Sequence, residues 1–184
     1  FTHMASPKYL EDLSARGNGA MKKRIARVYD IARERPQAID TAKRVELLKR
    51  YGIDQQVVTL FNIVDSNAIP GDAPEKVRLA RAINDSMAAI MTESKGRLLA
   101  AASVPLEALE PGGLKEMDRA IKTLGLKAVA FPSHLHGKPL DSPEFLPFWA
   151  RAAELDVLVF IHPSNPLTPD GRPYAFNPGS PERV

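Results

Sequence analysis

The segment Leu155–Pro166 reads LDVLVFIHPSNP and contains an unbroken apolar run, Val157–Ile161, which leads into His162 and then at once into a proline. The length of the run and its apolar residues predict a short strand that is buried on both faces. Strands of this kind are typical of parallel sheets in α/β proteins. Because such sheets bind ligands at the carboxyl ends of their strands, the position of His162 is that of a candidate functional residue.

The same unit recurs along the chain. Three further apolar stretches predict strands over residues 53–61, 97–105 and 126–133, and His3 is expected to close a first strand. Amphipathic helices are predicted over 39–52, 71–91, 111–125 and 141–156, with N-caps at Asp40, Asp72 and Ser142. This alternation predicts a parallel α/β fold, closed as an open doubly wound sheet or as a (β/α)8 barrel. No Gly-x-Gly-x-x-Gly or Walker sequence follows a strand, so a nucleotide-binding fold is not favoured.

Composition narrows the class of protein. The 184 residues are 44% hydrophobic, enough for one domain with a core. No apolar run is long enough to cross a membrane, and the absence of cysteine fits a reducing compartment, so a cytoplasmic protein without membrane contact is expected. The net charge of +3 comes largely from residues 16–50, where acidic residues are interspersed and aromatic ones are scarce. That pattern favours a solvated helix face over a nucleic-acid site.

All four histidines lie at or just beyond the end of a predicted strand: His3, His134, His136 and His162. Imidazole is a common metal ligand and the usual acid or base at neutral pH, so the placement predicts a metal or catalytic site. The alternative is that each is a hydrogen-bonded structural residue, and that His134 and His136 belong to a polar loop.

Two stretches resemble the amidohydrolase superfamily, in particular its amidohydrolase 2 branch of the aminocarboxymuconate-semialdehyde decarboxylase type. They are RLLAAASVPLEALEPGGLKEMDRAIKTLGLKAVAFPS and LDSPEFLPFWARAAELDVLVFIHP, and RVELLKRYGIDQQVV and INDSMAAI add to the match. The resemblance runs in order over nearly all of residues 1–166. It implies an α/β fold, a (β/α)8 TIM barrel of the metal-dependent hydrolase type, with this chain covering roughly the first five β/α units.

The resemblance also implies one divalent metal, usually zinc, at the carboxyl ends of the strands. In the family the fifth strand ends in a ligand histidine before proline, the position that His162 matches. The first strand ends in His-x-His, and His3 matches the second of these ligands. Phe1 stands in place of the first and cannot bind a metal.

Family members use an arginine near the barrel mouth to hold a substrate carboxylate, and Arg35 lies in roughly the matching segment. His134, just past a predicted strand, is the second candidate for substrate contact, although the family pattern assigns it no catalytic role. Arg44 is expected on a helix surface. The family's catalytic histidine and last metal ligand come from later strands, so the catalytic group is expected downstream of Val184. Barrels of this type need about 250 residues. Residues 1–184 are therefore interpreted as a single incomplete barrel domain.

The leading hypothesis is a metal-dependent decarboxylase or hydrolase acting on a small unsaturated or aromatic carboxylic acid. The alternative is a non-catalytic, degenerate barrel fragment that serves in binding or assembly. Exposed strand edges would favour a homo-oligomer. Three expectations can be checked directly. The strands are parallel neighbours in chain order, the ring nitrogens of His3 and His162 lie within roughly 4 Å of each other, and this chain alone binds metal weakly with little turnover.

Overall fold

The computed structural model describes residues 3–17, 19–60, 71–135 and 138–162. Its five strands are β1 (His3–Met4), β2 (Gln56–Leu60), β3 (Leu98–Ser103), β4 (Ala128–Pro132) and β5 (Leu158–His162). They form one sheet in the order β1-β2-β3-β4-β5, and every neighbouring pair is parallel. The predicted order and direction of the strands are therefore confirmed. The predicted end of β2 at Phe61 lies outside the described residues.

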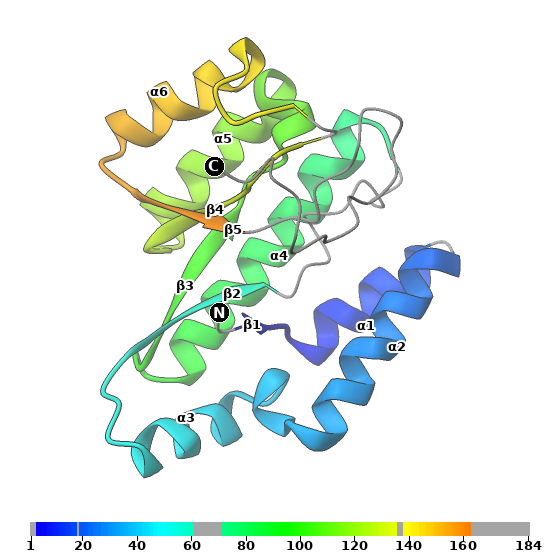
Figure 1. Ribbon diagram of the computed structural model, residues 1–184, viewed down its shortest axis with the longest axis vertical. Helices are drawn as coiled ribbons and strands as arrows, with labels where there is room; N and C mark the ends of the chain where they lie inside the picture. Colours follow the sequence, from blue (N-terminus) through cyan, green and yellow to red (C-terminus); the bar gives the residue numbers. More distant parts are fainter. Residues whose placement is uncertain (1–2, 18, 61–70, 136–137, 163–184) are drawn as a thin grey trace, which may run out of the picture.

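Helices connect and cover the strands (Figure 1). The α-helices are α1 (Pro7–Arg16), α2 (Gly19–Glu34), α3 (Thr41–Arg50), α4 (Ala73–Glu93), α5 (Leu114–Asp118) and α6 (Leu146–Glu154). Shorter helical turns are η1 (Pro36–Ala38), η2 (Leu106–Ala108), η3 (Leu109–Gly113), η4 (Arg119–Thr123) and η5 (Pro143–Phe145). In the described part of the chain, no helix is long and apolar enough to cross a membrane.

Two of the predicted N-caps are confirmed. Asp40 accepts a hydrogen bond from the backbone N–H of Lys43, and Asp72 accepts one from Glu75. Ser142 precedes η5 but makes no capping hydrogen bond through its side chain. Such caps satisfy backbone N–H groups that the first turn of a helix leaves without partners.

The helix predicted over 111–125 is divided into η3, α5 and η4. Its start is crowded: a Cβ atom at Gly113 would lie 2.7 Å from the carbonyl oxygen of Ala108. Only glycine allows so close an approach, and the wider turns of η3 and η4 flank a short α-helix. Gly125, at φ +73°, ends the segment as expected.

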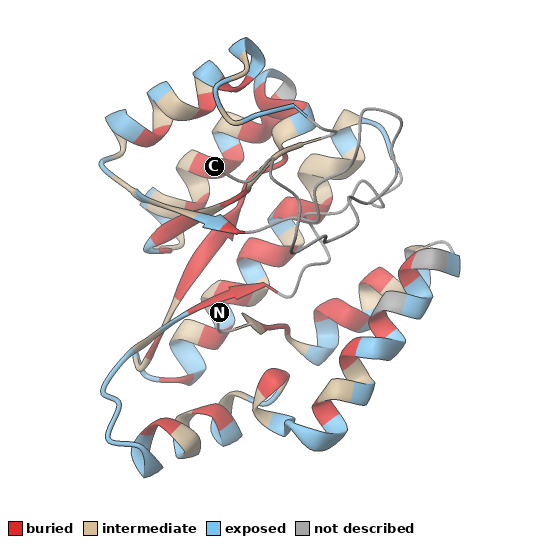
Figure 2. Cartoon of the chain, viewed as in Figure 1, coloured by how far each residue is buried: buried red, intermediate tan, exposed pale blue. Residues whose placement is uncertain are grey.

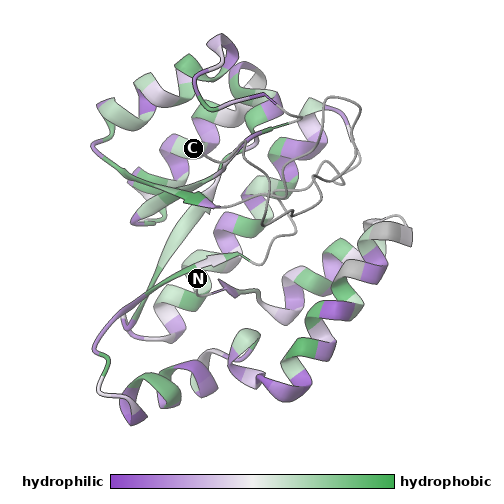
Figure 3. Cartoon of the chain, viewed as in Figure 1, coloured by the Kyte–Doolittle hydropathy of each residue, from purple (hydrophilic) through white to green (hydrophobic). Residues whose placement is uncertain are grey.

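The core lies between the central strands and the helices packed on them. Ala100, Ala101 and Ala102 of β3 are buried, as the colouring in Figure 2 shows along this strand. A second centre of packing is aromatic, with the rings of Phe145, Phe148 and Trp149 around Phe131. In Figure 3 the strands are largely hydrophobic, while helices carry hydrophilic residues on part of their surface.

One expectation about burial is wrong. We expected every strand to be buried on both faces, but Leu158 and Ile161 of β5 are 61% and 47% exposed. Among the described strands β5 lies at the edge of the sheet and pairs only with β4. Its apolar side chains therefore lack the second neighbour that covers those of β3.

Candidate metal centre

His3 and His162 come from the two outermost strands of the described sheet, and their rings approach each other with their planes tilted by 48°. The Nε2 atoms are 3.2 Å apart, and the ring centroids are 5.0 Å apart. Four strand spacings in a flat sheet would separate β1 from β5 by about 19 Å. The sheet must therefore curl strongly, as in a barrel, for these side chains to meet. The expected proximity of the two rings is confirmed.

The other nitrogen of His3 fixes the orientation of its ring. Nδ1 lies 2.8 Å from the hydroxyl oxygen of Thr59 and 3.1 Å from the carbonyl oxygen of Leu60, both on β2. Because a carbonyl can only accept a hydrogen bond, we assign the proton of the neutral ring to Nδ1. Nε2 is then the nitrogen with a lone pair, and it is the nitrogen directed at His162. In metal sites, the ring nitrogen of a histidine that does not bind the metal typically donates a hydrogen bond to a carbonyl, a carboxylate or a water.

Burial lowers the pKa of His3 below its ordinary value of 6.5, and the charge of His162 acts in the same direction. The hydrogen bond to the Leu60 carbonyl opposes these effects but does not reverse them. His3 is therefore neutral at neutral pH, the state in which imidazole binds a metal.

Two imidazole nitrogens at this distance can share one group between them. A proton on Nε2 of His162 makes a neutral N–H···N hydrogen bond to His3, and a divalent cation can take the place of that proton and bind both lone pairs. Two nitrogens about 2.0–2.1 Å from a tetrahedral zinc would lie about 3.3 Å apart. The observed separation fits a shared divalent cation. Within residues 3–17, 19–60, 71–135 and 138–162 there is no group of three or more potential ligand side chains, so the described donors supply two ligands.

The remaining predicted site residues lie outside the sheet strands that carry this pair. His134 is half-buried two residues beyond β4, next to Ser133, whose N–H donates to the carbonyl of His162 over 2.8 Å. Arg35 is exposed at the turn between α2 and η1, and the structure does not bring it to the histidine pair. Their contact with substrate stays a prediction. Phe1 and His136 lie outside the described residues.

The interpretation of Arg44 as a surface residue is wrong. It is only 8% exposed, and its Nη2 donates to the carbonyl oxygen of His3 over 2.8 Å. Its Nε donates to the carbonyl oxygen of Gln37 over 3.1 Å. Helical spacing could have indicated that Arg44 is buried, because it lies one turn before Leu48, which is 1% exposed.

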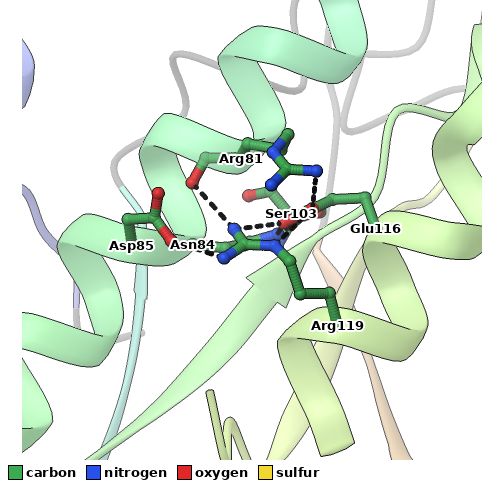
Figure 4. A network of polar contacts seen from close by, with 6 residues as sticks. All are labelled: Arg81, Asn84, Asp85, Ser103, Glu116 and Arg119. Atoms are coloured by element: carbon green, nitrogen blue, oxygen red, sulfur yellow. Dashed lines mark hydrogen bonds and ion pairs between the residues drawn. The ribbon is translucent and has the colours of Figure 1, made fainter. Parts of the chain in front are cut away.

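A polar network fixes the carboxyl end of β3, two strands from His3 (Figure 4). Asn84 of α4 is fully buried and exchanges two hydrogen bonds with the backbone of Ser103, of 3.0 and 2.8 Å. It also donates to Glu116 over 2.9 Å, and Glu116 is paired with Arg119. The sequence analysis did not predict this network, because it assigned Asn84 to a helix and to no contact with another element.

A groove of about 690 Å³ lies elsewhere, between α1 and α4, and is lined by residues such as Tyr9, Asp12 and Glu93. None of the predicted site residues that the structure describes lines it. We place the candidate centre at the histidine pair, because two convergent ligand nitrogens indicate binding chemistry more directly than an open groove does.

The chain belongs to the amidohydrolase family, whose model matches residues 3–183. A gamma-resorcylate decarboxylase of Rhizobium radiobacter is 32% identical over 183 residues, which are 96% of this chain and 52% of that relative. A 2-amino-3-carboxymuconate-6-semialdehyde decarboxylase of Dictyostelium discoideum is 31% identical over 140 residues, or 76% of this chain and 38% of that relative.

A dihydroxybenzoic acid decarboxylase of Polaromonas sp. JS666 has a similar structure, solved with bound manganese and the inhibitor 2-nitroresorcinol. The TM-score is 0.67 at 24% identity, covering 92% of this chain and 49% of that one. The chain thus spans about half the length of the relatives it matches. The (β/α)8 TIM-barrel fold class is confirmed, and the five described strands correspond to roughly its first five β/α units.

Proposed function

We propose that the protein is a divalent-metal-dependent, non-oxidative decarboxylase of a small aromatic or unsaturated carboxylic acid. The observation that carries the proposal is the 3.2 Å separation of the Nε2 atoms of His3 and His162 at the carboxyl edge of the sheet. Family membership supports it, because the similar proteins include decarboxylases of a resorcylate and of a carboxymuconate semialdehyde.

His3 and His162 would hold the cation, and Thr59 and the carbonyl of Leu60 would keep the His3 ring in place. When bound, a divalent cation acts as a Lewis acid that polarises the oxygens of a carboxylic acid substrate. Two imidazole ligands favour zinc over a metal that prefers oxygen ligands. Zinc is therefore our first candidate, and manganese, which the Polaromonas enzyme binds, is the second.

Decarboxylation breaks the bond between the substrate and its carboxyl carbon, and the electron pair stays on the substrate carbon. That carbon must then accept a proton, so the reaction requires a positioned acid within about 3 Å. Apart from the histidine pair itself, His134 is the histidine in the described ranges that lies near this edge of the sheet. We propose that His134 and Arg35 contact the substrate and assign neither the acid's role. Turnover by this chain is accordingly expected to be slow.

The test measures carbon dioxide release from 2,6-dihydroxybenzoate by metal-free protein, and by protein supplied with zinc or manganese. Release that requires metal and is lost in His162→Ala supports the proposal. Release that a chelator and His162→Ala leave unchanged contradicts it. Stoichiometric metal binding without turnover would instead favour a degenerate barrel that serves in binding or assembly.

We also propose that residues 1–184 belong to a single barrel domain, of which they supply roughly the first five β/α units. Copies of the chain would associate through exposed apolar strand residues. A cytoplasmic location stays a prediction from the absence of cysteine.

A further inference from the structure

Arg44 is a buried charged residue that the described part of the chain holds through backbone carbonyls. Its side chain is 8% exposed, and burial lowers its pKa. Both hydrogen-bond acceptors that receive its N–H groups are backbone carbonyls, those of His3 and Gln37. Among the described residues no carboxylate forms an ion pair with it. Burying a guanidinium is unfavourable, so its two hydrogen bonds must be well placed to retain it there.

The strand that Arg44 contacts is paired to β2 through two described residues. β1 consists of His3 and Met4, which pair with Thr59 and Leu60 of β2. Contacts from outside the sheet also hold β1: the hydrogen bond of Arg44 to His3, and the bond from the N–H of Ala5 to the carbonyl of Ala38 in η1.

His3 is therefore held at two points. Thr59 and Leu60 hold Nδ1 of the ring, and Arg44 holds the backbone carbonyl from the side of α3. Nε2 is left directed at His162. Because metal binding requires ligand atoms within about 0.5 Å of their productive positions, a small shift of β1 would separate the pair too far to share one cation.

We infer that Arg44 is a positioning residue, which sets the distance between the imidazole rings of His3 and His162 by anchoring the His3 backbone to η1. The inference deepens the proposed function, since it concerns the same metal site, but the geometric part holds in the metal-free protein as well. The positioning role of Arg44 depends on its two hydrogen bonds and does not require an ion pair.

The first measurement is made without metal. The ring centroids of His3 and His162 are 5.0 Å apart, close enough for a nuclear Overhauser cross-peak between their ring protons. We expect the cross-peak in the wild type and its loss or marked weakening in Arg44→Met. Leu48→Ala, in the same helix, is the matched control: it removes buried side-chain volume from α3 without touching the hydrogen bonds to His3 and Gln37. It should lower stability and keep the cross-peak.

The second measurement is zinc affinity by calorimetry. Loss of a residue that orients a metal ligand weakens binding by about 10- to 100-fold, and we expect this of Arg44→Met. Arg44→Lys retains the charge but cannot span both carbonyls, so its loss should be smaller than that of Arg44→Met and larger than that of Leu48→Ala. If Arg44→Met does not fold, the comparison of Arg44→Lys with Leu48→Ala decides.

The inference is overturned if the Arg44 variants keep both the cross-peak and wild-type affinity, or if Leu48→Ala loses them equally. The proposed metal site fails in a different way. In that case the wild type itself binds no zinc, whatever the cross-peak shows.

Discussion

His3 uses its two ring nitrogens for different tasks. Nδ1 is committed to Thr59 and Leu60 on β2, while Nε2 is directed at His162. The burial that lowers its pKa also keeps the ring neutral, so the same environment orients the nitrogen and leaves its lone pair available. A metal-binding role follows from this combination more than from the presence of histidine alone.

The hydroxyl of Thr59 can be tested separately from the bulk of its side chain. Thr59→Val keeps the shape but removes the partner of His3 Nδ1, so we expect zinc affinity to fall by about 10-fold. Thr59→Ser keeps the hydroxyl and should bind zinc nearly as well as the wild type. Calorimetric titration of both variants checks this. Equal affinities for the two would show that the hydroxyl does not orient the ring.

At the residue scale, sequence and family pattern were enough to predict that His3 and His162 would meet. Both end strands, and strand ends converge in a parallel fold. Arg44 was misread because charge favours the surface in most helices, and the acceptors that hold it inside are backbone carbonyls. These carbonyls are brought to Arg44 by tertiary packing, so no pattern in the sequence could indicate them.

The elements around the site depend on buried polar contacts as much as on apolar packing. Asn84 joins α4 to the end of β3, and Glu116 extends the connection to α5. A helix interior is an unfavourable place for asparagine, and tertiary hydrogen bonds override this preference here.

Asn84→Ala should destabilise the protein by about 3 kcal/mol, because it leaves the N–H and carbonyl of Ser103 without their buried side-chain partner and removes one of the hydrogen bonds to Glu116. Chemical denaturation measures the difference. Arg81→Gln is the control: its side chain is 55% exposed at the margin of the same network, and its effect should stay within about 0.5 kcal/mol. A similar small effect for Asn84→Ala would mean that water replaces the lost bonds.

The contact between α5 and α6 should make stability depend on acid pH. Arg151 donates two hydrogen bonds of 2.6 Å to Asp118, which lower the pKa of that carboxyl below its ordinary value of 3.8. A lowered pKa in the folded state contributes stability above pH 3.8 that is lost as the pH falls through the folded value.

Because the pair is partly exposed, we expect its contribution to be about 1 kcal/mol or less. Asp118→Asn should unfold more readily than the wild type at pH 6, and the difference should shrink at pH 3. Urea denaturation at both values checks this prediction. A constant difference at the two values would show that Asp118 acts through packing and not through its charge.

At the scale of the whole molecule, the strand order and the curl of the sheet determine where chemistry can occur. The repeat of apolar strand and amphipathic helix was sufficient to predict parallel neighbours in chain order. It was not sufficient to predict exposure, because burial of β5 depends on what lies beside that strand and not on its own composition. The division of the 111–125 helix was also missed, since it arises from a close backbone approach at Gly113.

The exposed apolar residues of β5 should promote self-association. Leu158→Lys places a charge on this edge strand, and charges of this kind oppose pairing with a second chain. We expect the wild type to associate with rising concentration in sedimentation velocity and Leu158→Lys to do so less. Tyr51→Lys, at a residue 67% exposed beyond α3, is the control and should behave as the wild type does. Equal association of all three proteins would place the contact elsewhere.

The most direct test of the central claim is a calorimetric zinc titration of the wild type, His3→Ala and His162→Ala. Two histidines fill half of a tetrahedral zinc shell, so we expect one zinc ion per chain with a dissociation constant weaker than about 1 μM, and loss of binding in either variant. Binding that survives both substitutions, or no binding by the wild type, would contradict the assignment of His3 and His162 as ligands of one cation.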